Sequence, residues 1–414
     1  MEDLEIIFNS FEKACSAGDF TSAESLIQQL EELSTKDDTA NIIYSKAVVK
    51  AIDVFKGRFS SIKLKKLLAN VERIVGTYPN EKELVNNYAK ALRFSLSAMS
   101  TKGQPNVMKE IIGYLENLAL SNPDNIVIYE ELSQASHEIV DFWKKRGDFQ
   151  ALRNRTSKFR ELVKKFPNNE LIKLNLSKSL VDEIDSSNKR DIEKVDNLLL
   201  EIQQLSESMP MNIGLQLEWV HAYRTAMDRT KEKPDYAHKW LNSMKEIVAN
   251  KKDDAFKIEL AKGYINAISL GELKQEELVK YLDEIEKLAV SIKENRELQA
   301  IYSQSLIIAL QYIGIQDYTK TQKILKDMQK LVDEFSDDEL IVNIYVEALT
   351  GVIGLLVQDQ KADEIVALLN ELERLDKEYP KNEFIQQTFD QLSSVLKMIG
   401  FKRTKEKPKR MDYL

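Results

Sequence analysis

Apolar and small residues recur along the chain as a five-residue phrase: an aromatic residue or Leu, a small residue, a polar residue, a second small residue and usually an apolar residue. Successive copies begin 33 residues apart at the start of the chain and 41 to 44 residues apart afterwards. A constant spacing in this range is typical of stacked helical repeats. Clear copies begin at Tyr44, Tyr88, Leu132, Leu176, Leu260 and Tyr302, and looser copies begin at Phe11, Trp219, Tyr345 and Phe389.

A second apolar pattern follows each phrase and predicts that every repeat contains two antiparallel helices. Between Leu67 and Val75, apolar side chains occur three and four residues apart, as on a one-sided helix. The turn inside a repeat carries Gly18-Asp19-Phe20 or Gly147-Asp148-Phe149, in which Gly can adopt the left-handed backbone that ends a helix.

A Pro-containing motif separates successive repeats. Pro removes a backbone donor and ends the second helix, while the Asn or Asp that follows can cap the next helix. These stop motifs are Tyr78-Pro79-Asn80, Asn122-Pro123-Asp124-Asn125, Phe166-Pro167-Asn168-Asn169, Met209-Pro210-Met211-Asn212 and Tyr379-Pro380-Lys381-Asn382, with Phe335-Ser336-Asp337-Asp338 as a substitute.

The periodicity predicts an all-α fold in which residues 1–400 form a single solenoid of about nine helical hairpins plus a terminal helix. The composition agrees, since the 414 residues include only 13 Gly and 8 Pro, which favours long uninterrupted helices. Residues 401–414 form a separate basic tail in this prediction.

The segment from Phe11 to Tyr44 resembles a tetratricopeptide repeat in Phe11, Ala14, Gly18-Asp19-Phe20 and Ala23. The later units look like lengthened relatives of about 43 residues, and the resemblance covers roughly residues 1–400. It implies a right-handed αα-superhelix that binds other proteins. Because the later period exceeds that of standard tetratricopeptide units, a HEAT-like or another α-solenoid curvature stays open.

The polar third residue of the phrase recurs at one angular position on every first helix and forms a column. In tetratricopeptide proteins the equivalent residue faces a concave groove and contacts extended peptides, so the resemblance implies a ligand-facing column here. The alternative is a solvated helix surface. The column contains Lys13, Lys46, Lys90, Gln134, Lys178, His221, Lys262, Gln304, Glu347 and Gln391.

Neighbours one helical turn away extend the positively charged part of this column. An Asn and a Lys together can bind a peptide backbone and a carboxylate, which favours an acidic or C-terminal peptide as the ligand. The predicted groove residues are Lys46, Asn87, Lys90, Arg93, Gln134, Asn175, Lys178, His221, Arg224 and Lys262.

Charge and composition narrow the function further. The net charge of −8 disfavours nucleic-acid binding. Because the Lys column and the basic tail could contact a nucleic acid, such binding is the alternative function. Cys15, the single cysteine, is expected in the core of a protein from a reducing compartment. The N-terminus lacks the features of a signal peptide, and no apolar run reaches membrane-spanning length, so we expect a cytoplasmic protein without a membrane span.

The sequence shows no motif for catalysis. The three His residues have no His or Cys partner at metal-ligand spacing, and the Gly residues do not cluster as in a phosphate-binding loop. We therefore expect no enzyme activity, no metal and no cofactor, and predict an interaction scaffold for an unidentified protein or peptide.

The C-terminal end allows three interpretations. The tail with six basic residues is an arm that contacts an acidic partner, or it is a frayed solubilising segment. In the third interpretation, the uncovered last helix is a docking face for self-association.

Overall fold

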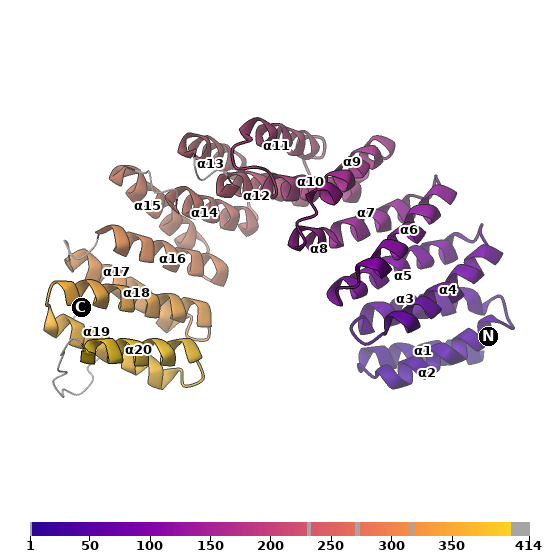
Figure 1. The fold of residues 1–414 in the computed structure, drawn as a ribbon, viewed down its shortest axis with the longest axis horizontal. Coiled ribbons are helices and arrows are strands. Elements are labelled where there is room, and N and C mark those ends of the chain that lie inside the picture. The colour runs from indigo at the N-terminus through magenta and orange to yellow at the C-terminus, as the bar shows by residue number, and fades with distance from the viewer. Residues whose placement is uncertain (1, 230–232, 270–273, 314–317, 399–414) are drawn as a thin grey trace. The chain divides into compact units, whose positions relative to one another are not determined.

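The computed structural model describes residues 2–229, 233–269, 274–313 and 318–398. All regular secondary structure in these ranges is helical (Figure 1). The helices that carry the phrase are called first helices here, and their bounds are α1 (Glu2–Ser16), α3 (Ala40–Phe55), α5 (Lys82–Thr101), α7 (Ile126–Glu138), α10 (Glu170–Asp185), α12 (Ile213–Arg229), α14 (Asp254–Ser269), α16 (Arg296–Ile313), α18 (Glu339–Gln358) and α20 (Glu383–Met398).

A second helix follows each first helix except the last within the described ranges. A short helix, α8 (Val140–Lys145), continues α7 after a one-residue break at Ile139. The second helices are α2 (Phe20–Ser34), α4 (Ser61–Thr77), α6 (Pro105–Ser121), α9 (Phe149–Lys165), α11 (Ile192–Glu207), α13 (Pro234–Val248), α15 (Gln275–Ser291), α17 (Tyr318–Glu334) and α19 (Ala362–Glu378).

The chain forms two compact units, unit 1 at residues 1–222 and unit 2 at residues 223–414. In unit 1, α3 packs on α5 and α5 packs on α7, and in unit 2 α16 packs on α18 in the same way. The all-α repeat fold predicted from the phrase is confirmed. One continuous solenoid over residues 1–400, its handedness and its number of repeats stay predictions.

The small residues of the phrase explain why first helices pack so closely. In α3, α5, α7, α10, α14 and α16 a buried small residue lies on either side of the column residue, so little side-chain bulk separates the helix from its neighbours. At Gly263 an added Cβ would lie 2.8 Å from Cε of Met244 on α13, so a larger residue would displace that side chain. The buried small residues include Ser45, Ala47, Ala89, Ala91, Ser133, Ala135, Ser177, Ser179, Ala261, Ser303 and Ser305.

The turns follow the predicted chemistry. Gly18 and Gly147 have φ values of +68° and +70°, the left-handed region that Gly adopts without strain. The Asp that follows each Gly caps the second helix, since Asp19 accepts a hydrogen bond from the Ser22 amide at 3.1 Å and Asp148 accepts one from the Ala151 amide at 3.0 Å.

The Asn residues of the stop motifs also join consecutive repeats, a role that we did not predict. Asn125 donates a hydrogen bond to Asn86 at 2.8 Å, and Asn382 donates one to Asn343 at 2.9 Å. Asn169 caps α10 through the Ile172 amide and also donates to a Glu of the preceding first helix. One residue type therefore begins a helix and fixes it against the previous repeat.

Helix α18 requires a correction of the predicted absence of any apolar run of membrane-spanning length. Within the described ranges it is the one helix long and apolar enough to cross a membrane by length and composition, with a mean hydropathy of 2.1. Half of the apolar stretch of α18 is buried in unit 2, and α18 contacts α16, α17, α19 and α20. These contacts are those of a core helix. The charged Glu347 near the middle of α18 interrupts the apolar sequence, so the length of the run was not predicted.

Helix α20 ends the described part of unit 2 and packs on α18 and α19. Its exposed side chains include the polar Gln387, Asp390, Gln391 and Ser394 and the apolar Phe384, Val395 and Met398. Self-association through this helix stays a prediction, and the predicted basic tail at residues 401–414 lies outside the described residues.

Candidate functional site

The predicted column lies on the first helices and reaches solvent. Lys46 is exposed, while the other predicted groove residues of the column are partly exposed, namely Lys90, Gln134, Lys178, His221 and Lys262. His221 on α12 lies 3.5 Å from Glu218, one turn away on the same helix. The column thus has a solvent-facing position, and the partners of its charges determine what it can bind.

Two of the column lysines already pair with carboxylates of the next first helix. Lys46 of α3 lies 2.6 Å from Glu83 of α5. Lys262 of α14 lies 3.1 Å from Glu259 of its own helix and 2.8 Å from Glu297 of α16. These pairs neutralise the column locally and connect consecutive repeats.

The two predicted arginines also join first helices. Arg93 of α5 donates to Glu131 at 2.6 Å and to Glu138 at 2.7 Å, both on α7, and its guanidinium lies 4.1 Å from the ring centre of Phe94. Arg224 of α12 donates to Glu259 of α14 at 2.6 Å. Both guanidinium groups are engaged in the stack, so they offer less to a ligand than we predicted.

The pKa of Glu259 reflects this engagement. Burial alone would raise the pKa, but the charges and hydrogen bonds of Arg224 and Lys262 outweigh burial, and the pKa lies below its ordinary value. The carboxylate therefore stays charged in the folded protein to a lower pH than in the unfolded chain. The ion pairs of this cluster stabilise unit 2.

Asn87 and Asn175 were predicted to contact a ligand, and the structure instead places both in the interior. They are 8% and 3% exposed, and each amide donates at 2.9 Å to the phrase serine of the preceding first helix, Ser45 or Ser133. The reason is angular: three residues along a helix rotate the side chain by about 300°, leaving it about 60° from the column. That rotation points the amide toward the neighbouring first helix.

Among the predicted groove residues, Lys90, Lys178 and Gln134 have side chains that contact no polar partner within the described part of the chain. Each lies on a first helix of unit 1 and is partly exposed. Of the four lysines predicted to line the groove, Lys90 and Lys178 keep a charge that a ligand can use. They form the remaining candidate for binding an acidic segment in unit 1.

A groove runs between α16 and α18 of unit 2, on the same layer of first helices. It consists of two adjoining hollows of about 730 Å³ and about 260 Å³ that share Ile307, Gln311 and Glu347. Aliphatic side chains, including Ile301, Ile344 and the 59% exposed Leu340, line it, with the column residues Gln304 and Glu347 among them. An apolar surface with a few polar groups is typical of a binding groove.

Helix α18 has two exposed glycines near this groove. A Cβ built at Gly351 or at Gly354 would meet no atom within 4 Å, so packing does not require glycine at either position. Each Gly costs the helix about 1 kcal/mol relative to Ala. Gly351 lines the smaller hollow, and a glycine there leaves the backbone of α18 accessible to a ligand.

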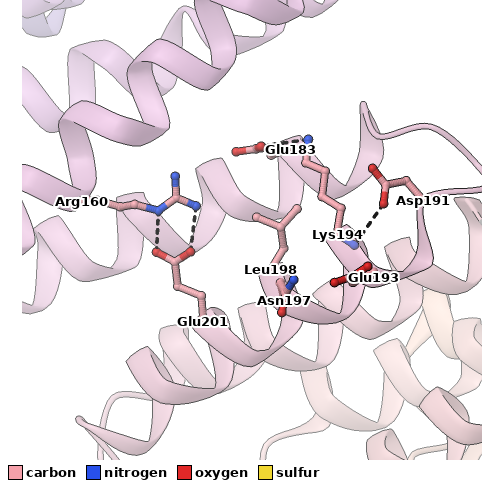
Figure 2. Close-up of a pocket in the computed structure, with 8 residues that line it drawn as sticks. All are labelled: Arg160, Glu183, Asp191, Glu193, Lys194, Asn197, Leu198 and Glu201. Atoms are coloured by element: carbon pink, nitrogen blue, oxygen red, sulfur yellow. Dashed lines mark hydrogen bonds and ion pairs between the residues drawn. The ribbon is translucent and has the colours of Figure 1, made fainter.

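A charged cleft in unit 1 is lined by residues of the second helices α9 and α11 and of the first helix α10. Figure 2 shows the guanidinium of Arg160 facing both carboxylate oxygens of Glu201, at 2.8 Å each, and Lys194 reaching Glu183 at 3.1 Å. These contacts connect α9 to α11 and α11 to α10. These two ion pairs connect the walls of the cleft, which has a volume of about 380 Å³.

A neighbouring hollow in unit 1 contains Lys173 of α10, which is 6% exposed and donates to Ser208 at 2.8 Å. Burial lowers the pKa of this lysine. In the parts of the chain that the structure describes, no three His, Cys, Asp or Glu side chains gather as ligands for a metal ion.

No protein-family model and no curated protein matches the chain. Solved structures similar to it include a monomeric mutant of IFIT1 with m7Gppp-AAAA, at 12% identity and a TM-score of 0.29 over 94% of this chain and 80% of that one. The TPR domain of P58(IPK) matches at 11% identity and a TM-score of 0.23, over 97% of this chain and 100% of that domain.

A circular tandem repeat protein matches at 13% identity and a TM-score of 0.27, over 95% of this chain and 94% of that one. At such low scores these similarities carry no argument about function. The repeat character rests on the helical hairpins themselves, their phrase and their turns. Within the described residues, the protein is an all-α protein built from repeated helical hairpins.

Proposed function

We propose that the protein is a non-enzymatic cytoplasmic scaffold that binds a peptide or protein segment on its layer of first helices. The observation that carries this proposal is the groove between α16 and α18, in which aliphatic side chains and a few polar groups lie together on a first-helix surface. Such a surface loses apolar contact with water when a polypeptide covers it. The single cysteine supports a reducing compartment.

Unit 1 supports a finer part of the proposal, an acidic or C-terminal segment as one ligand. Lys90 and Lys178 are partly exposed, and neither forms an ion pair within the described ranges. An ammonium group in this position forms charge-assisted hydrogen bonds with a carboxylate. Nucleic-acid binding has less support, because Lys46 and Lys262 are neutralised by carboxylates and cannot both contribute to a continuous basic surface.

Site-specific photo-cross-linking tests the proposed function. A photoreactive amino acid replaces Lys90 or Gln304 on first helices, or the exposed Glu72 and Lys323 on second helices as matched controls. The full chain is then irradiated in lysate of its native host, and cross-linked proteins are identified by mass spectrometry. Protein adducts from the first-helix positions alone support the proposal. Equal adducts from the second-helix positions, or adducts with RNA alone, would contradict it.

A further inference from the structure

The charges along the α16/α18 groove are compensated except at one position. Arg296 lies 2.8 Å from Asp337, Glu297 lies 2.8 Å from Lys262, and Asp338 caps α18 by accepting from the Leu340 and Ile341 amides. Glu347 has no such partner within the described part of unit 2, and it lines both hollows. The middle of the groove therefore presents one uncompensated negative charge.

The surroundings of Glu347 are apolar. Ile307 and Ile344 lie in the same hollow, and Val352 and Leu355 line the hollow that continues beyond it. Glu347 is exposed, so its carboxylate can reach an opposite charge on a segment that covers these aliphatic side chains. The amides of Gln304 and Gln311 at the edge can bind a backbone in either direction, because each offers both a donor and an acceptor.

The accessible backbone of α18 adds a steric feature. Gly351 has no side chain, so the groove is open at this position. Gly354 lies about one helical turn further along α18 and does not line the groove. Along α18 the lining runs from Asp338 to Leu355, which corresponds to about 26 Å of helix. That length accommodates about eight residues of an extended chain.

We propose that the α16/α18 groove binds a segment of a partner protein that places aliphatic side chains along α18 and pairs one Lys or Arg with Glu347. This inference rests on the proposed function and names the chemistry of the partner in unit 2. The charge complementarity distinguishes it from the acidic segment proposed for Lys90 and Lys178 in unit 1. An acidic segment is repelled by Glu347.

Peptide display on the full chain tests this inference. A phage-displayed library of random 16-residue peptides is selected separately on the unmodified protein, on Glu347→Lys, on Gly351→Leu and on Gly354→Leu. The last variant is the matched control, since it adds the same side chain to the same helix outside the groove. Circular dichroism and thermal melting establish that each variant is folded.

The unmodified protein and Gly354→Leu are expected to select peptides with one Lys or Arg among aliphatic residues. In fluorescence anisotropy, we expect Glu347→Lys and Gly351→Leu each to weaken the binding of such a peptide by at least about tenfold. Glu347→Lys removes one charge-assisted contact, and Gly351→Leu places a side chain in the groove. Selection on Glu347→Lys instead enriches Asp or Glu at the corresponding peptide position. This reversal of charge preference is the specific signature of the proposal.

Several outcomes would overturn the inference while leaving the proposed function testable at Lys90. These are an absence of enriched peptides, enriched peptides without a cation, or equal affinity for all folded variants. A deletion of residues 399–414 that raises peptide affinity more than about tenfold would assign the groove to the chain's own basic tail. A dimer that Glu347→Lys dissociates, measured by light scattering, would assign it to a second copy.

Discussion

Replacing Asn175 by Ala tests whether the buried amides belong to the fold or to a ligand site. The substitution removes the 2.9 Å hydrogen bond to Ser133 and leaves a small cavity at a position that is 3% exposed. Losing a buried hydrogen-bond partner costs about 1–3 kcal/mol, so we expect the free energy of unfolding to fall by about 2 kcal/mol. For a unit of this size, that corresponds to a melting temperature lower by about 4–8 °C.

The measurement is urea and thermal unfolding followed by circular dichroism, with Lys178→Ala as the matched control. Lys178 lies three residues further along the same helix but is partly exposed, so its removal should change the free energy of unfolding by less than about 0.5 kcal/mol. A double-mutant cycle with Ser133→Ala should give a coupling of about 1 kcal/mol. Unchanged stability of Asn175→Ala combined with lost partner capture would refute the structural role and restore the predicted ligand contact.

The remaining predictions concern charge and the thiol. The pKa of Glu259 is depressed in the folded state, so its contribution to stability is fully present above the unfolded value of about 4.3 and is lost as the pH falls through the folded pKa. Acid unfolding of Glu259→Gln should therefore show a weaker pH dependence below pH about 5, and an identical dependence would contradict this cause. Burial, the main influence, raises the pKa of the 4% exposed Cys15, so a thiol reagent should modify it only as the protein unfolds; rapid reaction in native buffer would count against its core position. Reversing the charge of Lys90 and Lys178 together should weaken capture of an acidic partner while helicity stays unchanged, and undiminished capture by the folded variant would remove these residues from the site.

Local patterns predicted most of the fold. The left-handed turns at Gly18 and Gly147 were predicted from the order of adjacent residues alone, whereas the caps that Asp19 and Asp148 provide were not predicted, although the same residues are adjacent in the sequence. The buried small residues followed from the phrase in the same way. Interactions between residues that are close in the sequence can be predicted from one sequence, because the backbone fixes the distance between them.

Contacts between repeats were harder to predict. The column argument placed Asn87 and Asn175 with the lysines, although the angular offset on the helix points their amides toward Ser45 and Ser133. The partners of Arg93 are 38 and 45 residues away, and nothing in the spacing specifies which of many carboxylates it contacts. Such pairs depend on how the helices pack, which one sequence does not show. We therefore predicted more unpaired basic residues in the groove than the structure has.

The groove was missed for a different reason. Gln304 and Glu347 were recognised as members of the column, but the predicted site followed positive charge and ended at Lys262. The groove depends on aliphatic side chains of two helices about 40 residues apart and on the missing side chain at Gly351. A search for phrases in which the column residue lacks a nearby opposite charge and the helix contains exposed Gly could have found it.

Hydrogen–deuterium exchange of the full chain with and without a display-selected cationic peptide tests the central claim most directly. The account predicts slower exchange in α16 and α18, at residues 296–313 and 339–358, with no change in the second helices α9 and α11 of unit 1. It also predicts that Glu347→Lys abolishes this protection. Protection confined to second helices, or protection of α16 and α18 that persists in Glu347→Lys, would contradict it.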